Sequence, residues 1–300
     1  MTSLPLTSEK RFAYIKDYID RMPSLSTTVT KVLEVCNHPN ASPNDLNRVI
    51  SLDPVLTGQV LKLINSAYYS LPNQITSLTR AIIMLGLNTV KNLALSTAVL
   101  GTIGKEESFQ CLPMDPFWTH SICVGVTAKT MAIHKGVEPA FREEFFVAGL
   151  LHDLGKIPLN NCFTHEYQQS LDLAKLEQGA LYRSESMMMG ITHGEVGNLI
   201  AEKWQLTGAL AEVLCYHHAP EKAIKKNRGL IAIVAAANMY ANMYEIGSAG
   251  DAYVEPSDVA SILKMIGMNW SDLGNFHETV QNEIDKAQIF LKVAEGAARG

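Results

Sequence analysis

Six side chains in the second half of the sequence have the chemistry to bind a metal ion together. They are His120, His152, Asp153, His193, His217 and His218. Each lies within or beside a segment whose apolar residues recur at helical spacing. Imidazole nitrogens and a carboxylate oxygen suit iron, manganese, zinc or nickel. We therefore expect these side chains to meet in one site that holds a divalent transition metal, as one ion or as two.

The same residues also allow a purely structural interpretation. Buried histidines and an aspartate can form a hydrogen-bonded network that fixes the packing of helices. An intermediate possibility is a bound metal that stabilises the fold without taking part in catalysis. For the four other histidines we expect ordinary core or surface roles, because a single histidine in a helix is more often such a residue than a ligand. These four are His38, His134, His165 and His277.

The His152-Asp153 pair stands where an apolar, buried-type helix is expected to end, just before Gly155. Lys156 and Glu185 are candidates to orient the ligands through hydrogen bonds. A bound metal would lower the pKa of a water molecule to about 7, and Lys156 could pair with a phosphate oxygen. Asp153 and Lys156 are therefore the candidate catalytic residues for hydrolysis of a phosphoester.

The elements that must position these residues all have helical signatures. Ser42-Pro43 and Asp53-Pro54 each combine an N-cap residue with proline at the first helical position. Ser8 is expected to cap an earlier helix. The alternating apolar and polar runs that are typical of strands are nearly absent. The sequence therefore predicts an all-α fold, a multi-helix bundle with short turns.

One segment differs from its helical surroundings. Gly101–Asp115 holds two glycines, a proline and a short charged run, a composition that is typical of a junction. We expect it to separate two helical units that pack on each other, residues 1–105 and residues 106–300. The second unit carries the six candidate ligands and extra C-terminal helices.

Composition argues against several classes of protein. The chain has 300 residues, of which 47% are hydrophobic and 18% are charged, and this suits a globular protein with a substantial core. A net charge of −5 without a basic stripe argues against nucleic-acid binding. Thr79–Leu95 could form a helix-turn-helix, but its second helix is mostly apolar, so packing in the core is favoured.

Cysteine usage and hydropathy indicate the compartment. The five cysteines are scattered and form no CxxC pair, which favours free thiols in a reducing environment. Met1–Ser8 lacks the apolar core of a signal peptide. The most apolar stretch, Gly229–Ala237, is far too short to span a bilayer. We therefore expect a cytoplasmic protein that does not bind membranes.

In order and spacing these motifs resemble the HD superfamily, and the chain as a whole resembles its HDOD branch over residues 20–245. In the first half the resemblance rests on Met22-Pro23-Ser24-Leu25, Asp53-Pro54-Val55-Leu56-Thr57 and Leu63-Ile64-Asn65-Ser66-Ala67. In the second half it rests on Phe117-Trp118-Thr119-His120, Gly149-Leu150-Leu151-His152-Asp153-Leu154-Gly155-Lys156, His193-Gly194-Glu195-Val196-Gly197 and Tyr216-His217-His218.

The resemblance implies an N-terminal HDOD-type helical half packed on an HD-like helical domain. HD proteins are typically metal-dependent phosphohydrolases, and their metal set is a first histidine, the His-Asp pair and a distal aspartate. The distal position here is Asn238, whose neutral amide is a poorer ligand than a carboxylate. His193, His217 and His218 match the extra ligands of the related HD-GYP phosphodiesterases, which hold two metals.

HDOD domains generally serve as signalling or regulatory modules without a settled catalytic activity. We therefore expect a bacterial signal-transduction module whose HD-type site binds metal. The alternative is a metal-dependent phosphohydrolase that acts on a cyclic nucleotide or a nucleotide. The expected partners are signalling proteins or a phosphorylated small molecule such as a cyclic nucleotide.

Overall fold

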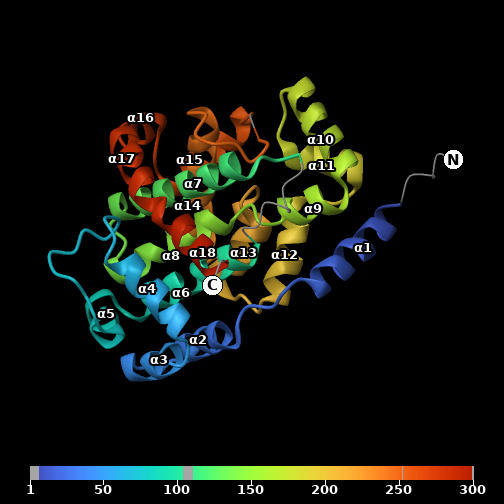
Figure 1. The fold of residues 1–300 in the computed structure, drawn as a ribbon. Coiled ribbons are helices and arrows are strands. Elements are labelled where there is room, and N and C mark those ends of the chain that lie inside the picture. The colour runs from blue at the N-terminus through green and yellow to red at the C-terminus, as the bar shows by residue number, and fades with distance from the viewer. Residues whose placement is uncertain (1–6, 104–110, 252, 299–300) are drawn as a thin grey trace.

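The predicted all-α fold is confirmed. The structure, a computed structural model, describes residues 7–103, 111–251 and 253–298, and every regular element in those ranges is a helix (Figure 1). In chain order they are α1 (Ser8–Arg21), α2 (Thr27–Asn37), α3 (Pro43–Ile50), α4 (Pro54–Ile64), α5 (Leu78–Leu85), α6 (Leu87–Ile103), α7 (Met114–His134), α8 (Pro139–Leu151), α9 (Lys156–Cys162), α10 (Thr164–Glu177), α11 (Leu181–Met189), α12 (His193–Lys203), α13 (Gly208–Tyr216), the 3-10 turn η2 (Pro220–Lys222), α14 (Arg228–Met243), α15 (Pro256–Ile266), α16 (Trp270–Gly274), α17 (His277–Ala287) and α18 (Ile289–Ala298).

Local capping explains where several of these helices begin. Ser42 and Asp45 form a reciprocal capping box at α3, and the Asp53 carboxylate accepts a hydrogen bond from the Leu56 backbone N–H at α4. Both caps agree with the sequence. The expected Ser8 cap is wrong by one residue, because the Thr7 hydroxyl accepts the hydrogen bond at the start of α1. Ser8 is the first helical residue instead.

The centre of the molecule is the antiparallel pair α7 and α8 (Figure 1). The two backbones touch at Gly125 and Gly149, where a Cβ on Gly149 would lie 2.7 Å from the Gly125 Cα. A methyl group cannot fit at that distance, so both positions need glycine for the helices to come this close. The close crossing aligns His120 on α7 with His152, the residue that follows α8.

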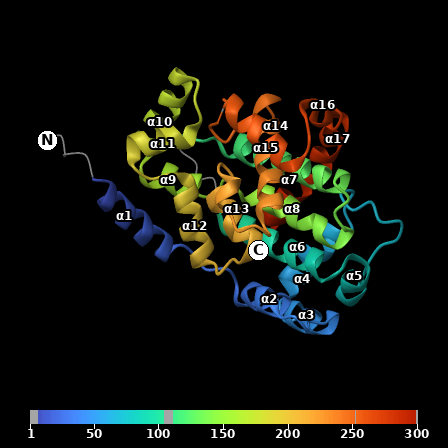
Figure 2. The same cartoon turned by 180° about the vertical axis from the view of Figure 1, so that it is seen from behind.

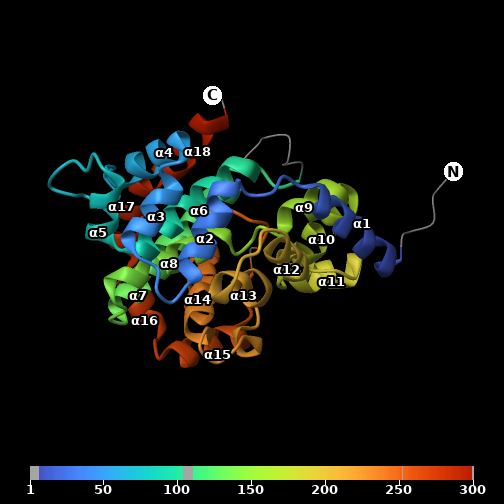
Figure 3. The ribbon, with the colours of Figure 1, turned by 90° about the horizontal axis from the view of Figure 1, so that it is seen from below.

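The N-terminal helix packs on the second half of the chain, and the C-terminal helix packs on the first half. Helix α1 lies against α9 and α12, away from α2 to α5 (Figure 2). Helix α18 lies against α4 and α6, and Figure 3 shows α4 and α18 side by side. The expected boundary between residues 105 and 106 lies outside the described residues, and the division at that point stays a prediction.

A half-buried ion pair lies where α7 and α8 meet the segment after α4. The Lys129 ammonium contacts the Glu143 carboxylate at 2.7 Å and donates to the Tyr68 hydroxyl at 3.0 Å. The same ammonium lies 4.2 Å from the centre of the Tyr68 ring. Tyr68 also packs edge-on against Phe290 of α18. This contact joins the first and second halves of the chain.

Within the described part of the chain, no single helix combines the length and the apolar composition needed to cross a membrane. Helices α5 and α6 reach both together, but the chain bends by 119° between them. Most of α6 is buried against the rest of the protein.

Candidate metal centre

The six predicted ligands converge in the interior, and each stands at or near the end of a helix. His120 lies in the second turn of α7, His152 and Asp153 follow α8, His193 opens α12, and His217 and His218 follow α13. They form two groups that share Asp153, and the ligand atoms of each group lie within 4.8 Å of one another. Four of the imidazoles and the carboxylate are at most 1% exposed, and His218 is half-buried.

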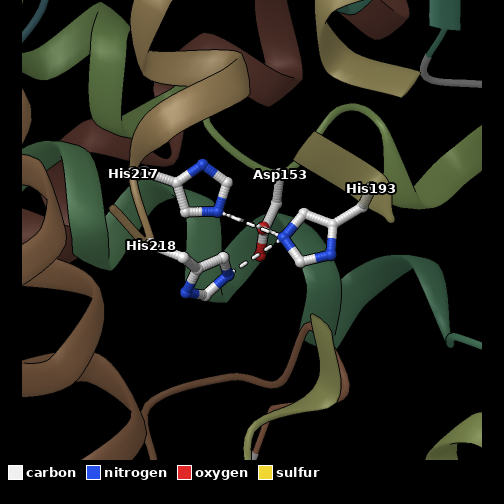
Figure 4. Close-up of side chains that lie close together, drawn as sticks. All are labelled: Asp153, His193, His217 and His218. Atoms are coloured by element: carbon white, nitrogen blue, oxygen red, sulfur yellow. Dashed lines mark hydrogen bonds and ion pairs between the residues drawn. The ribbon is translucent and has the colours of Figure 1, made fainter. Parts of the chain in front are cut away.

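The first group, called here the three-histidine group, contains Asp153, His193, His217 and His218 (Figure 4). The Nε2 atom of His193 lies 3.2 Å from His217 Nε2 and 3.0 Å from His218 Nε2. Asp153 Oδ1 lies 3.6 Å from His193 Nε2 and 3.4 Å from His217 Nε2. All four side chains therefore point at a common centre.

The second group, called here the two-histidine group, contains His120, His152 and Asp153. The other carboxylate oxygen, Asp153 Oδ2, lies 3.2 Å from His152 Nε2 and 3.8 Å from His120 Nε2. Neither ring nitrogen of the fully buried His120 has a hydrogen-bond partner among the described residues. An unpaired buried polar atom is energetically costly. The His120 ring therefore needs a binding partner that the described residues do not provide.

Contacts behind the ligands fix which nitrogen carries the proton. The Nδ1 atoms of His152 and His217 face the backbone carbonyls of Gly149 at 2.7 Å and Val213 at 2.8 Å. A carbonyl oxygen can only accept, so in both rings Nδ1 carries the hydrogen and Nε2 presents a bare lone pair. Carbonyl and carboxylate partners of this kind orient histidines that bind metals.

Glu185 does the same for His193, as the sequence predicted for an orienting residue. Its buried carboxylate lies 2.7 Å from His193 Nδ1 and accepts the His193 backbone N–H at 2.8 Å. Burial acts to lower the pKa of His193, but the adjacent Glu185 charge raises it overall. With its Nδ1 atom directed at Glu185, His193 turns its Nε2 atom toward His217 and His218.

The other buried groups have protonation states that favour metal binding. Burial lowers the pKa of His120 to about 3 and that of His217 to about 4, so both rings are neutral near pH 7. Burial opposes ionisation of Asp153, but His152 and Lys156 hold the pKa of its carboxyl well below its usual range. Neutral imidazoles and an ionised carboxylate are the forms that bind metals.

Comparisons with known proteins identify the family. The sequence pattern of the HDOD domain matches residues 22–220, which is about two thirds of the chain and includes all six predicted ligands. The chain belongs to the HDOD domain family. A relative from Treponema pallidum (strain Nichols), an uncharacterized protein, is 27% identical over 239 residues, which are 77% of this chain and 44% of that protein. This chain thus spans less than half of that relative's length.

Solved structures share the HDOD fold. An HDOD domain protein of unknown function from Geobacter sulfurreducens has a TM-score of 0.71 at 24% identity, covering 94% of this chain and 99% of its own. A protein from Shewanella amazonensis SB2B, provisionally named a phosphohydrolase, has a TM-score of 0.68 at 24% identity, covering 94% and 98%. A provisionally named signal transduction protein from Marinobacter aquaeolei VT8 has a TM-score of 0.69 at 17% identity, covering 98% and 66%. At these identities the likeness shows the fold.

Asn238, the seventh predicted ligand, lies beyond the HDOD match, on α14. It is buried and lines a cavity of about 40 Å³ together with His217 and His218. Its side-chain oxygen accepts a hydrogen bond from Asn242 at 3.3 Å. The structure therefore places Asn238 beside the three-histidine group, and its role as a ligand stays a prediction. The other four histidines lie outside both groups.

Asp251 is a member of the site that the sequence did not reveal. It stands in the segment between α14 and α15, after the Gly247–Gly250 break. Its Oδ2 atom contacts the Lys156 ammonium at 2.5 Å, and its Oδ1 atom accepts the Leu181 backbone N–H at 3.0 Å. An isolated aspartate in a turn is usually a surface residue. The one hint in the sequence was that Asn238 stands where HD proteins have their distal aspartate, so a second carboxylate was missing from the motif.

Lys156 is completely enclosed by this HDOD site. Its ammonium contacts Asp153 Oδ2 at 2.8 Å and donates to Asp251 and to the Ala249 carbonyl, the latter at 3.0 Å. Gly155, just before it, lets α9 begin directly against α12, because a Cβ there would lie 1.9 Å from the His193 carbonyl oxygen. The tight approach keeps Lys156 and His193 in one site.

Proposed function

We propose that this HDOD chain is a bacterial signal-transduction module in which the HD-type site binds a divalent transition metal without turning over a phosphorylated substrate. The bound metal would be iron, manganese, zinc or nickel, which are the ions that histidine and carboxylate ligands suit. Its role would be to hold the helix ends that carry the ligands in one arrangement.

The enclosure of Lys156 carries this proposal. The Lys156 ammonium donates hydrogen bonds to Asp251 and to the Ala249 carbonyl, and it forms an ion pair with Asp153 Oδ2 at 2.8 Å. Lys156 is also fully buried. A phosphate oxygen could reach this ammonium, as hydrolysis would require, only if the buried site opened and the oxygen displaced one of these protein partners.

Metal binding itself is supported by the bare lone pairs. His152 and His217 direct unprotonated Nε2 atoms toward the Asp153 carboxylate, an acceptor as well. Acceptors that face one another across 3.2 to 3.4 Å repel unless a cation lies between them. When bound, such an ion supplies Lewis-acid activation of water. The cavity beside His217 and His218 is only about 40 Å³, enough for water but far too small for a nucleotide.

A second candidate, a metal-dependent phosphohydrolase, is favoured by one observation. A groove of about 640 Å³ adjoins His218, and its lining includes Tyr182, Thr192 and Lys222. That volume is in the range of small-molecule sites and would hold a nucleotide. Opening of the site from this side would bring a phosphoester toward the three-histidine group.

One assay separates the two candidates. Protein purified without oxygen is analysed for metal and incubated with a cyclic dinucleotide and with a simple phosphodiester. We expect bound metal and no metal-dependent product. Loss of metal in Asp153→Ala, with the wild-type protein still inactive, fits the regulatory module. Product release by the wild-type protein that Asp153→Ala abolishes would instead establish the phosphohydrolase.

The proposed setting is the bacterial cytoplasm. All five cysteines are free thiols in the structure, as is usual in reducing compartments. The proposed partners are signalling proteins or a phosphorylated small molecule such as a cyclic nucleotide. Affinity capture and ligand-binding assays with the metal-loaded chain would identify them.

A further inference from the structure

We infer that the site holds a single divalent ion, bound by the three-histidine group, and that the Lys156 ammonium acts as a built-in cation in place of a second ion. This inference rests on the proposed metal binding and specifies its number and position. It depends on how differently the structure equips the two oxygens of Asp153.

The three-histidine group has the dimensions of a complete coordination shell. Four distances between its ligand atoms are 3.0, 3.2, 3.4 and 3.6 Å. Ligands about 2.0 to 2.1 Å from a tetrahedral ion lie about 3.3 to 3.4 Å apart, because a tetrahedron's edge is about 1.63 times its centre-to-corner distance. The observed distances scatter around that value. Three imidazoles and one carboxylate oxygen fill the four positions.

A proton alone does not satisfy this group. A proton on His193 Nε2 could be shared with His217 or with His218, but not fully with both. The Nε2 atom of His217 would still face Asp153 Oδ1 without a hydrogen between them, because its own proton is on Nδ1. A metal ion accepts lone pairs from all four ligand atoms at once.

The two-histidine group is less complete. It offers two imidazoles and Asp153 Oδ2, and that oxygen already contacts the Lys156 ammonium at 2.8 Å. The nitrogen of His120 is 3.8 Å from Oδ2, which is longer than a tetrahedral edge. No second carboxylate joins this group among the described residues. A divalent ion here would face a positive charge across one shared oxygen.

The Lys156 ammonium is held in place from the far side. One oxygen of Asp251 contacts the ammonium, and the other oxygen accepts a hydrogen bond from the Leu181 backbone N–H. The Ala249 carbonyl accepts a hydrogen bond from the ammonium as well. Gly247, in the same segment, packs against His120, where a Cβ would lie 2.3 Å from the His120 backbone nitrogen. The segment between α14 and α15 thus fixes the cation beside the two-histidine group.

The test counts metal ions per chain in matched variants. We expect one equivalent of manganese or zinc in the wild-type protein, loss of that equivalent in His218→Ala, and its retention in His120→Ala. Removal of the ammonium in Lys156→Met should raise the content to two, and His120→Ala added to Lys156→Met should return it to one. Lys175→Met, at an exposed position, is the control and should stay at one.

Lys156→Met leaves Asp251 buried without its partner, which can prevent folding. The double variant Lys156→Met with Asp251→Asn removes both charges together and serves as the second form of the test. In manganese-loaded protein, the electron paramagnetic resonance spectrum should show isolated ions in the wild type and coupled ions in the two-equivalent variants.

Each outcome has one meaning. No bound metal in any variant would overturn the proposed function and the inference with it. Two equivalents in the wild type, one of them lost in His120→Ala, would leave metal binding intact and overturn the single-ion inference. A single equivalent that depends on His120 but not on His218 would do the same. A folded Lys156→Met protein that stays at one equivalent would overturn the role assigned to Lys156.

Discussion

Glu185 sets the proton position on His193 without belonging to the ligand set. The change Glu185→Gln keeps an acceptor of similar shape but removes the charge beside Nδ1. Outer partners of metal-binding histidines typically contribute about 10- to 100-fold to affinity. We expect metal affinity to fall by about that factor, measured by competition with a coloured chelator. Glu202→Gln, at an exposed position on the same helix, is the control, and equal losses in both variants would contradict the role of Glu185.

The cysteines make a separate prediction about reactivity. Burial raises the pKa of Cys123 to about 12, that of Cys162 to about 12 and that of Cys36 to about 11. The thiolate is the reactive form, so these thiols should react slowly at pH 8 and speed up only as the pH approaches those values. Mass spectrometry after iodoacetamide treatment should find Cys123 unlabelled until urea unfolds the protein. Early labelling of Cys123 in the folded protein would refute this expectation.

Sequence reasoning found the histidines because their signal is local. His152-Asp153 and His217-His218 stand out as adjacent pairs, and each follows a predominantly apolar helix. Asp251 gave no such signal, since it enters the site only through the path of the segment after α14. The same limit applies to the bonding of Lys156. Its charge and the nearby Asp153 were visible in the sequence, but its hydrogen-bond acceptors Ala249 and Asp251 lie 93 and 95 residues further along the chain.

At the scale of elements, the close crossing of α7 and α8 determines how near His120 and His152 can lie. The change Gly149→Ala would place a methyl group 2.7 Å from the Gly125 backbone. Overpacking of this kind typically costs about 1–3 kcal/mol. We expect a loss of that size in the free energy of urea unfolding, together with weaker metal binding, because the helix ends must separate.

Gly58→Ala on α4 provides the matched control for that change. Gly58 is exposed in the helix interior, with no atom within 4 Å of an added Cβ. Alanine there should stabilise the protein by roughly 0.5–1 kcal/mol, because glycine is the poorer helix former. A Gly149→Ala protein at least as stable as the wild type would show that the crossing does not require glycine.

The helix starts were partly predictable, and the reason is again local chemistry. Ser42 and Asp53 act through hydrogen bonds to backbone N–H groups three residues later, so sequence alone suffices to find them. How α1 and α18 dock was not predictable, because it depends on surfaces that form only after the central helices have packed. Trp204, for example, donates a hydrogen bond to the Pro23 carbonyl across most of the chain.

At the scale of the whole molecule, a bound metal should stabilise the folded chain. An ion that binds the native state alone, at 100 times its dissociation constant, adds about 2.7 kcal/mol. For a chain of this size each kcal/mol raises Tm by roughly 2 °C or somewhat more. We expect removal of metal by a chelator to lower Tm by about 5 °C, and re-addition to restore it. An Asp153→Ala protein whose Tm still responded to metal would locate the binding elsewhere.

The first helix packs on the second half of the chain and the last helix packs on the first half, which predicts that the molecule unfolds as one unit. Helix α1 packs on α9 and α12, helix α18 packs on α4 and α6, and the Lys129–Glu143 pair with Tyr68 joins both halves inside. Separation of the halves would expose to water the apolar surface that is buried under α1 and α18, together with this ion pair. We therefore expect a single calorimetric transition, in which the calorimetric and van't Hoff enthalpies agree. Two resolved transitions, with only the second sensitive to chelation, would show instead that the half carrying the metal centre folds independently.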